Sequence, residues 1–353
     1  MPVRDVLIVG AGPSGLATAI AAKQHGLDYV VVEKGVLVNS IFNFPTHMVF
    51  FTTPELLEIG GLPLVTPFDK PTRLEALRYY RRVVETHGLH LSLHEDVVAI
   101  ERDGDVFAVT TRPADIGRAF TARQSAVMED HQLDTRRVRE ARAVVLAIGY
   151  YDHPNCLGVP GENLPHVSHY YTEAHPYYRR RVVIVGGRNS AAEAALELFR
   201  AGAHVTLVHR GAELGTSIKY WVRPDIENRI KEGSIAARFE TRVAEIRPHS
   251  VIVDRVGGGL QPSANGREEI PADAVLLLTG YRPDIALMQR AGIRCDEGTL
   301  APELDPETFE TNVPNLFIAG GAIAGRNTGS IFIENGRFHG DRIIKVLAER
   351  FGR

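Results

Sequence analysis

Two glycine-rich turns in this sequence contain the residue types that bind dinucleotides. The first, G-A-G-P-S-G at 10–15, follows an apolar stretch at 6–9 and precedes an alanine-rich stretch at 16–25. Glycines allow a tight turn and a close approach of the backbone to a pyrophosphate, which the N-terminus of the next helix attracts. Glu33 follows Gly10 by 23 residues, where a carboxylate accepts ribose hydroxyls and repels a 2′-phosphate. This turn therefore predicts a site for FAD or NAD.

The second glycine-rich turn begins 176 residues later, at Gly186, and is followed by charge of the opposite sign. It follows the apolar stretch 182–185, and Arg188 occupies the position of the middle glycine. His209 lies 23 residues after Gly186, and Arg210 comes next. Cationic side chains at this point suit the 2′-phosphate of NADPH. The turn therefore predicts an NADPH site, in which Arg188 either contacts a phosphate or loosens the pyrophosphate fit.

The cysteine content excludes several kinds of redox and metal site. Cys156 and Cys295 are the only cysteines, and they are 139 positions apart. A disulfide framework, a zinc site of paired cysteines and a C-x-x-C dithiol are thus excluded by counting. Histidines at 166, 169 and 175 lie close together, but their spacing matches no familiar metal motif. We therefore predict no metal site.

Length and charge further narrow the class of protein. A chain of 353 residues predicts two domains. Lysine and arginine number 40 against 43 acidic residues, so no net basic field favours nucleic acid or a membrane. No apolar run reaches the roughly 20 residues of a membrane span, and the start of the chain lacks the apolar stretch of a signal peptide. We expect a cytoplasmic protein.

Two similar apolar segments indicate how the domains are connected. Residues 143–150 and 274–281 each read as a buried strand that ends in Gly-Tyr, one after each glycine-rich unit. They are typical of the crossover points of an inserted domain. We predict an α/β protein of two Rossmann-like, three-layer ββα domains, with the NADPH domain inserted into the FAD domain. The FAD domain would comprise 1–152 and 278–353, and the NADPH domain 153–277. A helix is expected at Arg73–His87, and a C-terminal helix from about Ile331 or Asn335 to Glu349.

The order of these motifs resembles the low-molecular-weight thioredoxin reductase-like flavoproteins. Within them the chain is most similar to the bacillithiol-disulfide reductase (bacilliredoxin reductase) group. The segments that carry the closer resemblance are 38–51, 70–73, 149–154, 169–176 and 331–340. The resemblance implies FAD and NADPH as cofactors, and hydride transfer from NADPH to flavin and on to a disulfide such as bacillithiol disulfide or bacilliredoxin. It also implies a homo-oligomer, dimeric or tetrameric.

The resemblance and the motifs together assign candidate site residues. For FAD these are Gly10, Gly12, Pro13, Ser14, Gly15, Glu33, Lys34, Asn39, His47, Val97, Ala147, Gly149, Gly320, Gly321 and Ile331. For NADPH they are Gly186, Gly187, Arg188, Asn189, Ser190, His209, Arg210 and Lys219. No catalytic side chain is assigned, because the flavin itself would carry out the redox chemistry.

The chain departs from its relatives at three places. Thioredoxin reductases carry their dithiol just before the second nucleotide strand, where residues 169–178 contain no cysteine, so electrons must leave the flavin directly or through another group. Ser14 occupies the position of a cysteine in the bacillithiol group, and a hydroxyl cannot form a mixed disulfide. We interpret Ser14 as a pyrophosphate-binding residue. Gly321 replaces an aspartate that binds the FAD ribityl chain, for which the amides of Gly320 and Gly321 would substitute.

Other functions are compatible with the same motifs. A flavin-dependent monooxygenase is one, although the F-x-G-x-x-x-H spacing is not met around Gly161 and His166. A ferredoxin or quinone reductase is another. A third is a non-catalytic FAD-binding redox sensor, because the dithiol is missing and the second glycine motif is imperfect.

Overall fold

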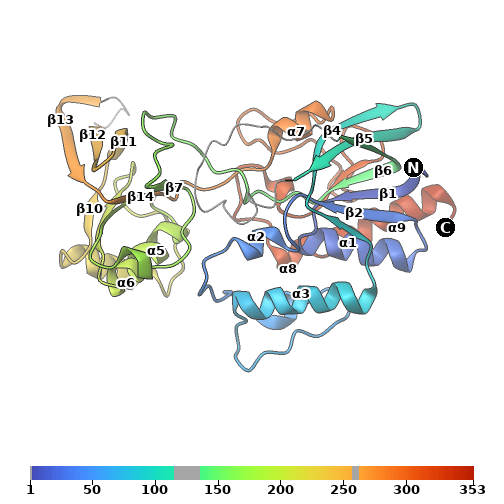
Figure 1. Cartoon of the computed structure of the whole chain (residues 1–353), viewed down its shortest axis with the longest axis horizontal. Coiled ribbons are helices and arrows are strands. Elements are labelled where there is room, and N and C mark those ends of the chain that lie inside the picture. The colour runs from blue at the N-terminus through green and yellow to red at the C-terminus, as the bar shows by residue number, and fades with distance from the viewer. Residues whose placement is uncertain (1, 115–135, 257–261) are drawn as a thin grey trace. The chain divides into compact units, whose positions relative to one another are not determined.

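The computed structural model describes residues 2–114, 136–256 and 262–353, which form two compact units (Figure 1). Of these residues, unit 1 contains 2–114, 136–153 and 281–353, and unit 2 contains 154–256 and 262–280. Unit 2 is thus an insertion in the sequence of unit 1. The units divide after His153 and after Gly280, close to the expected junctions at 152 and 277.

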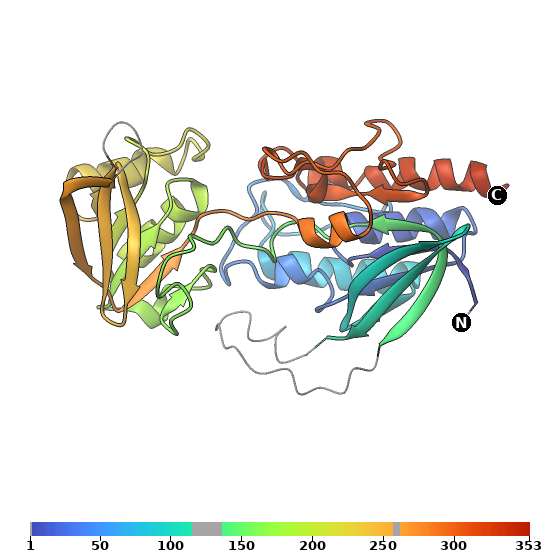
Figure 2. The same ribbon diagram turned by 90° about the horizontal axis from the view of Figure 1, so that it is seen from above.

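A parallel sheet forms the centre of unit 1. Its strands lie in the order β3 (Leu91–Leu93), β2 (Tyr29–Glu33), β1 (Arg4–Val9) and β6 (Arg137–Leu146), and β15 (Leu316–Ile318) pairs with β6. The first half of β6 instead continues an antiparallel sheet with β5 (Val106–Pro113) and β4 (Glu95–Asp103), seen side by side in teal and green in Figure 2. The long strand β6 therefore belongs to two layers.

Alternation of side chains along β1 separates the two faces of this sheet. Val6 and Ile8 are buried against the helices α1 (Pro13–Gln24), α3 (Arg73–His87) and α9 (His339–Phe351). Leu7 and Val9 are buried on the other face, with the antiparallel strands and α7 (Ile285–Arg290). Successive strand residues point to opposite faces, so an all-apolar strand is covered on both sides. Unit 1 therefore has three layers.

Unit 2 repeats this architecture. Its parallel sheet has the order β10 (Ala236–Arg238), β9 (His204–Val208), β8 (Arg181–Val185), β14 (Ala274–Leu277) and β7 (Val167–Ser168). Along β8, Val182 and Ile184 lie in the core with α5 (Asn189–Arg200) and α6 (Arg223–Lys231). Val183 and Val185 face an antiparallel sheet of β11 (Thr241–Arg247), β12 (Ser250–Val256) and β13 (Pro262–Pro271). The predicted class, α/β with two Rossmann-like ββα units, is confirmed.

Helix ends follow local sequence signals in one case and tertiary contacts in another. Helix α3 has its predicted bounds because Thr72 and Glu75 form a capping box and Gly88 ends the helix at φ +54°.

The predicted C-terminal helix is wrong at its start: a short α8 (Ile333–Gly336) precedes α9. Gly340 lies so close to Thr18 of α1 that a Cβ there would be 2.6 Å from the Thr18 backbone. Among the described residues, the remaining short helices are α2 (Asn39–Phe42) and three 3₁₀ turns at Pro54–Leu56, His175–Tyr177 and Gly320–Ala324. Within the three described ranges, no helix is long and apolar enough to cross a bilayer.

A buried ion pair links β4 and β6 within the antiparallel sheet of unit 1. Glu95 of β4 is 6% exposed and accepts hydrogen bonds from Arg139 of β6 at Nε and Nη2, both 2.7 Å long. It also accepts the hydroxyls of Ser92 and Thr111. Burial raises the pKa of Glu95, but the bonds from Arg139, Ser92 and Thr111 outweigh it and hold the pKa at about 2.

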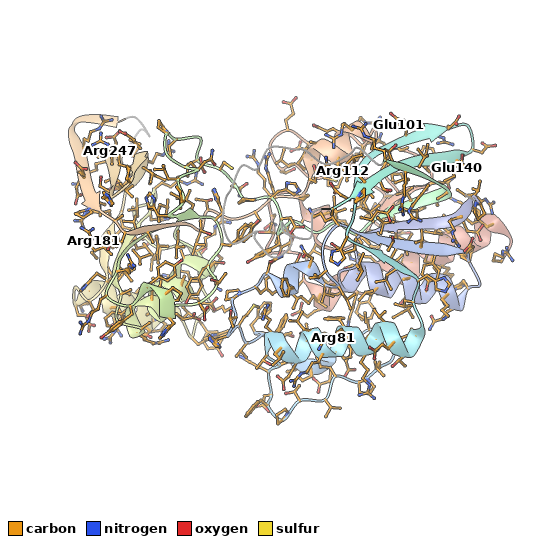
Figure 3. The ribbon with its side chains drawn as sticks, in the orientation of Figure 1. Arg81, Glu101, Arg112, Glu140, Arg181 and Arg247 are labelled. Atoms are coloured by element: carbon orange, nitrogen blue, oxygen red, sulfur yellow. The ribbon has the colours of Figure 1, made fainter. Side chains whose placement is uncertain are left out.

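We expect Glu95→Gln to lower the free energy of unfolding by about 3 kcal/mol at pH 7, since it leaves Arg139 without its anion. The folded-state pKa lies below the ordinary 4.5, so the wild-type carboxylate contributes fully above pH 4.5 and loses its contribution as pH falls toward 2. The difference between the two proteins, measured by urea unfolding, should therefore shrink over that range. Glu101→Gln, at an exposed position of the same strand (Figure 3), is the control and should change little. A constant difference from pH 7 to pH 3 would contradict the role of Glu95.

Candidate nucleotide-binding sites

The turn between β1 and α1 is formed by backbone contacts that admit only glycine at two positions. Gly10 has φ +106°, and a Cβ there would lie 2.4 Å from the carbonyl oxygen of Ala147. A Cβ on Gly15 would lie 1.9 Å from the carbonyl oxygen of Gly10. Gly12 differs, because a Cβ there would meet nothing within 4 Å. Gly10 and Gly15 therefore build the turn, while Gly12 leaves space above it.

The N-terminus of α1 faces that space without a side-chain cap. Gly12 is its N-cap residue and Pro13 its first residue, so the cap supplies no side-chain oxygen to the first amides of the helix. Uncapped amides at a helix N-terminus attract an anion through their N–H groups and the helix dipole. The first turn thus has the geometry and the charge of a phosphate site.

Glu33 lies at the end of β2 with its carboxylate held beside the turn. It is 6% exposed and accepts the backbone N–H groups of Ala11 and Gly35, each over 2.8 Å. Burial raises its pKa, and these two hydrogen bonds oppose the rise. A carboxylate offers about four lone-pair positions, so oxygens that accept two amides can still accept ribose hydroxyls. The next residue, Lys34, forms an ion pair with Asp152 at 3.0 Å.

Ser14 is packed among glycines that come from the other end of the chain. A Cβ on Gly320 would lie 2.6 Å from Ser14 Oγ, and one on Gly336 would lie 3.1 Å from it. Gly321 is also confined, because a Cβ there would lie 2.8 Å from the ring of Tyr150. The structure therefore brings the predicted residues of the turn, of the segment after β6 and of the segment after β15 to one edge of the sheet.

A buried histidine holds the Gly320 segment in place. His339, the first residue of α9, accepts the N–H of Gly320 through Nδ1 over 3.1 Å and stacks on Phe309 with ring centroids 4.2 Å apart. Burial, and to a smaller extent the positive charge of Arg342, lower the pKa of His339 to about 4. The ring is therefore neutral at pH 7 and keeps Nδ1 as an acceptor. Sequence reasoning missed this residue, because nothing in the sequence pairs position 339 with position 320.

The other residues predicted for FAD lie at varying depth in unit 1. Asn39 begins α2, and its side-chain oxygen lies 2.3 Å from where a Cβ of Gly35 would be. Ile331 packs beside Gly336, and Gly149 follows β6 with φ +59°. Val97 is buried with the side chains of β1 and β2, whereas His47 is exposed in a turn after α2.

The second glycine-rich turn is closed by a histidine ring. A Cβ on Gly187 would lie 2.3 Å from the ring of His209, and one on Gly211 would lie 2.7 Å from its Nε2. Burial lowers the pKa of His209, and the charges of Arg210 and Arg188 lower it further. His209 is therefore neutral at pH 7 and packs on the backbone. The positive charge that the sequence predicts for this pair lies on Arg210.

Two arginines beside this turn carry unneutralised charge. Arg188 is the N-cap residue of α5, and both Arg188 and Arg210 are exposed. In the parts of the chain that the structure describes, neither of them has an ion-pair partner. Most other arginines in the described part of unit 2 are paired. Arg181, labelled in Figure 3, pairs with Asp273, for example. An anion placed here would meet two cations that no carboxylate neutralises.

The remaining residues predicted for NADPH adjoin the same turn. The side-chain oxygen of Asn189 accepts the backbone N–H of Lys219 over 3.3 Å. The ammonium of Lys219 pairs with Glu193 at 2.9 Å, a partner that sequence reasoning missed. Ser190 is exposed in the first turn of α5. Three separate segments, 186–190, 209–211 and 215–219, thus meet at the carboxyl edge of the second sheet.

Comparison with known proteins agrees with this geometry. Residues 7–121 and 129–320 match the pyridine nucleotide-disulphide oxidoreductase family. The bacilliredoxin reductase Bdr of Bacillus subtilis (strain 168) is 40% identical over 348 residues, which cover 98% of this chain and 97% of that protein. The bacillithiol disulfide reductase Bdr of Bacillus cereus is 40% identical with a TM-score of 0.89 over 99% of this chain and all of that one. The bacillithiol disulfide reductase Bdr of Staphylococcus aureus is 37% identical, with a TM-score of 0.86 over 99% of each chain.

The two kinds of glycine in the first turn predict two different mutant phenotypes. Gly15→Ala should lower the free energy of unfolding of nucleotide-free protein by about 1–3 kcal/mol, because its methyl group meets the Gly10 carbonyl. Gly12→Ala should change it by less than about 1 kcal/mol, since φ is −75° and the space is open. The Gly12 variant should nevertheless purify with less bound flavin, measured by absorbance. Wild-type flavin content in Gly12→Ala would exclude this space as the nucleotide site.

Proposed function

The chain belongs to the pyridine nucleotide-disulphide oxidoreductase family, and we propose that it is an NADPH-dependent FAD enzyme that reduces bacillithiol disulfide or the mixed disulfide of a bacilliredoxin. Membership makes it an oxidoreductase that binds a flavin and a pyridine nucleotide. The contrast between the two glycine-rich turns carries the proposed assignment of FAD and NADPH to the two units. A buried carboxylate, Glu33, stands beside the first turn, and an exposed guanidinium, Arg210, stands one residue past the equivalent position of the second.

Unit 1 would hold FAD at the first turn. The uncapped amides of α1 and the open space above Gly12 suit its pyrophosphate. Glu33 would accept the ribose hydroxyls, and the segment at Gly320 and Gly321, held by His339, would supply backbone amides to the rest of the cofactor. FAD, when bound, supplies a carrier that takes two electrons from a nicotinamide and gives them to a disulfide.

Unit 2 would hold NADPH at the second turn. A 2′-phosphate carries negative charge that Glu33 would repel and that Arg210 and Arg188 would attract. The ring of His209 would form the floor of this site, and Asn189 would hold the loop at Lys219 beside it. These contacts orient the nucleotide, which is the protein's main contribution to hydride transfer.

The acceptor is proposed from the relatives and from the cysteines that this chain lacks. The overall reaction would be NADPH + H⁺ + RSSR → NADP⁺ + 2 RSH, so the two electrons of NADPH cleave one S–S bond. The chain contains no C-x-x-C motif, and Ser14 presents a hydroxyl that cannot form a mixed disulfide. The disulfide would therefore have to receive electrons from the flavin without a relay of two protein thiols.

Anaerobic mixing tests the proposed donor and acceptor separately. NADPH should bleach the visible absorbance of the flavin, and subsequent bacillithiol disulfide should restore it, with two thiols formed per NADPH. If oxidised ferredoxin, a quinone or oxygen restores the absorbance and bacillithiol disulfide does not, the disulfide is excluded as the acceptor. The protein would then still be an oxidoreductase. Failure of NADPH to bleach the flavin would contradict the enzyme as proposed and favour a redox sensor.

We expect Arg210→Ala to raise the KM for NADPH by about 10–100-fold, the equivalent of one charge-assisted hydrogen bond, and to leave the KM for NADH almost unchanged. Steady-state kinetics with both nucleotides measures the difference. Arg247→Ala removes an exposed arginine of β11 in the same unit (Figure 3), paired with Glu245, and should alter neither value. Equal increases for NADPH and NADH would exclude contact of Arg210 with the 2′-phosphate.

A further inference from the structure

A short segment at the start of unit 2 brings together three side chains with different metal-binding atoms. The sulfur of Cys156, a carboxylate oxygen of Glu162 and a ring nitrogen of His169 all lie within 4.8 Å of one another. Cys156 is exposed, Glu162 is buried and His169 is half-buried. None of the three belongs to the predicted nucleotide sites. Sequence reasoning tested His169 only against neighbouring histidines and so missed this cluster.

The backbone around the cluster is fixed by many hydrogen bonds. Hydrogen bonds join the first and last segments of unit 2. The N–H of Asn155 donates to the Gly280 carbonyl over 2.9 Å, and the Thr279 hydroxyl donates to the Asn155 carbonyl over 2.6 Å. Gly161 has φ +83°, and a Cβ there would lie 1.8 Å from the carbonyl oxygen of Ile246 in β11. His169 directly follows β7, which pairs with β14. The three side chains therefore project from a rigid frame.

The carboxylate of Glu162 is oriented in advance. Its Oε1 accepts the N–H of Leu157 and its Oε2 accepts the N–H of Gly158, each over 2.7 Å. Both bonds use only part of the acceptor capacity of a carboxylate. His169 Nε2 lies 3.4 Å from Glu162 Oε1. Bonds to metal-binding side chains from the surrounding backbone are what keep such ligands in place in known sites.

The distances and the charges fit a tetrahedral ion. In a zinc site with bonds of about 2.0–2.2 Å to nitrogen and oxygen, neighbouring donor atoms lie about 3.4 Å apart. The 3.4 Å between His169 Nε2 and Glu162 Oε1 equals this edge. The sulfur of the exposed Cys156 lies within 4.8 Å of the other two donor atoms, so a shift of about 1 Å would complete a third corner. A thiolate and a carboxylate together neutralise a divalent cation. Sulfur and imidazole ligands favour zinc over magnesium or calcium.

We propose that Cys156, Glu162 and His169 bind one Zn²⁺ per chain, with the fourth position open to water. On binding, the Cys156 thiol loses its proton to solvent and its sulfur bonds to the metal, with no change of oxidation state. The ion would tie the segment that enters unit 2 to the end of β7. This site is independent of the proposed disulfide reduction.

Cobalt(II) substitution of the flavin-containing protein tests the site by optical spectroscopy, without any measurement of activity. After removal of metals with a chelator, one equivalent of Co²⁺ should give the intense red-region bands of a tetrahedral site, at longer wavelength than the flavin, and Zn²⁺ should displace them. Cys156→Ser should abolish the thiolate contribution and weaken Zn²⁺ binding at least about tenfold, as should His169→Asn. Cys295→Ser, at the other cysteine, should leave the spectrum unchanged.

Cysteine alkylation and the cobalt spectra of the variants test the proposed zinc site further. Zn²⁺ should protect Cys156 from alkylation by iodoacetamide while Cys295 reacts at its usual rate, as measured by peptide mass spectrometry. Wild-type binding in Cys156→Ser, or weak bands of an octahedral cobalt ion, would overturn the proposal. Far-UV circular dichroism and flavin content distinguish loss of metal from loss of fold in each variant, and loss of binding only in variants that fail to fold would also overturn it.

Discussion

Close contact between backbone segments at the carboxyl edge of each sheet is the constraint on which both proposed nucleotide sites depend. In unit 1 the carbonyl of Ala147 occupies the space where Gly10 would carry a Cβ, and in unit 2 the carbonyl of Leu278 does the same for Gly186, at 2.6 Å. Each glycine-rich turn is thus packed against the residue that follows a neighbouring parallel strand, β6 in unit 1 and β14 in unit 2. This packing positions the N-termini of α1 and α5 at the sheet edge, where the proposed nucleotides would place their phosphates.

Once the turns are in place, a single residue at the end of the second strand distinguishes the two units. Glu33 is buried and keeps its acceptors beside the turn through the amides of Ala11 and Gly35. In unit 2 the corresponding residue, His209, is neutral and packs against the backbone of the turn, and the next residue, Arg210, carries the positive charge. The same fold therefore offers an acceptor in one unit and a cation in the other, and electrostatics rather than shape separates the proposed nucleotides.

The surroundings of Ser14 indicate a structural role for its side chain. Gly320 and Gly336 surround the Ser14 hydroxyl closely, and His339 fixes Gly320 from behind. A side chain confined by backbone on two sides serves to position that backbone. The chemistry proposed for this edge of the sheet relies on the cofactor and not on a pair of cysteines.

Local patterns in the sequence determined much of this protein. The glycine spacing, the apolar strands, the capping box at Thr72 and the charges at positions 33 and 210 each depend on residues near one another in the chain, so they predicted the α/β class, two repeated units and the bounds of α3. Only the tertiary structure decided which distant residues meet. The bond from Gly320 to His339, the pairing of Lys219 with Glu193, the neutral state of His209 and the cluster at Cys156 all depend on burial or on contacts across the fold. Burial and long-range contact are properties of the packed chain, and no spacing along the sequence encodes them.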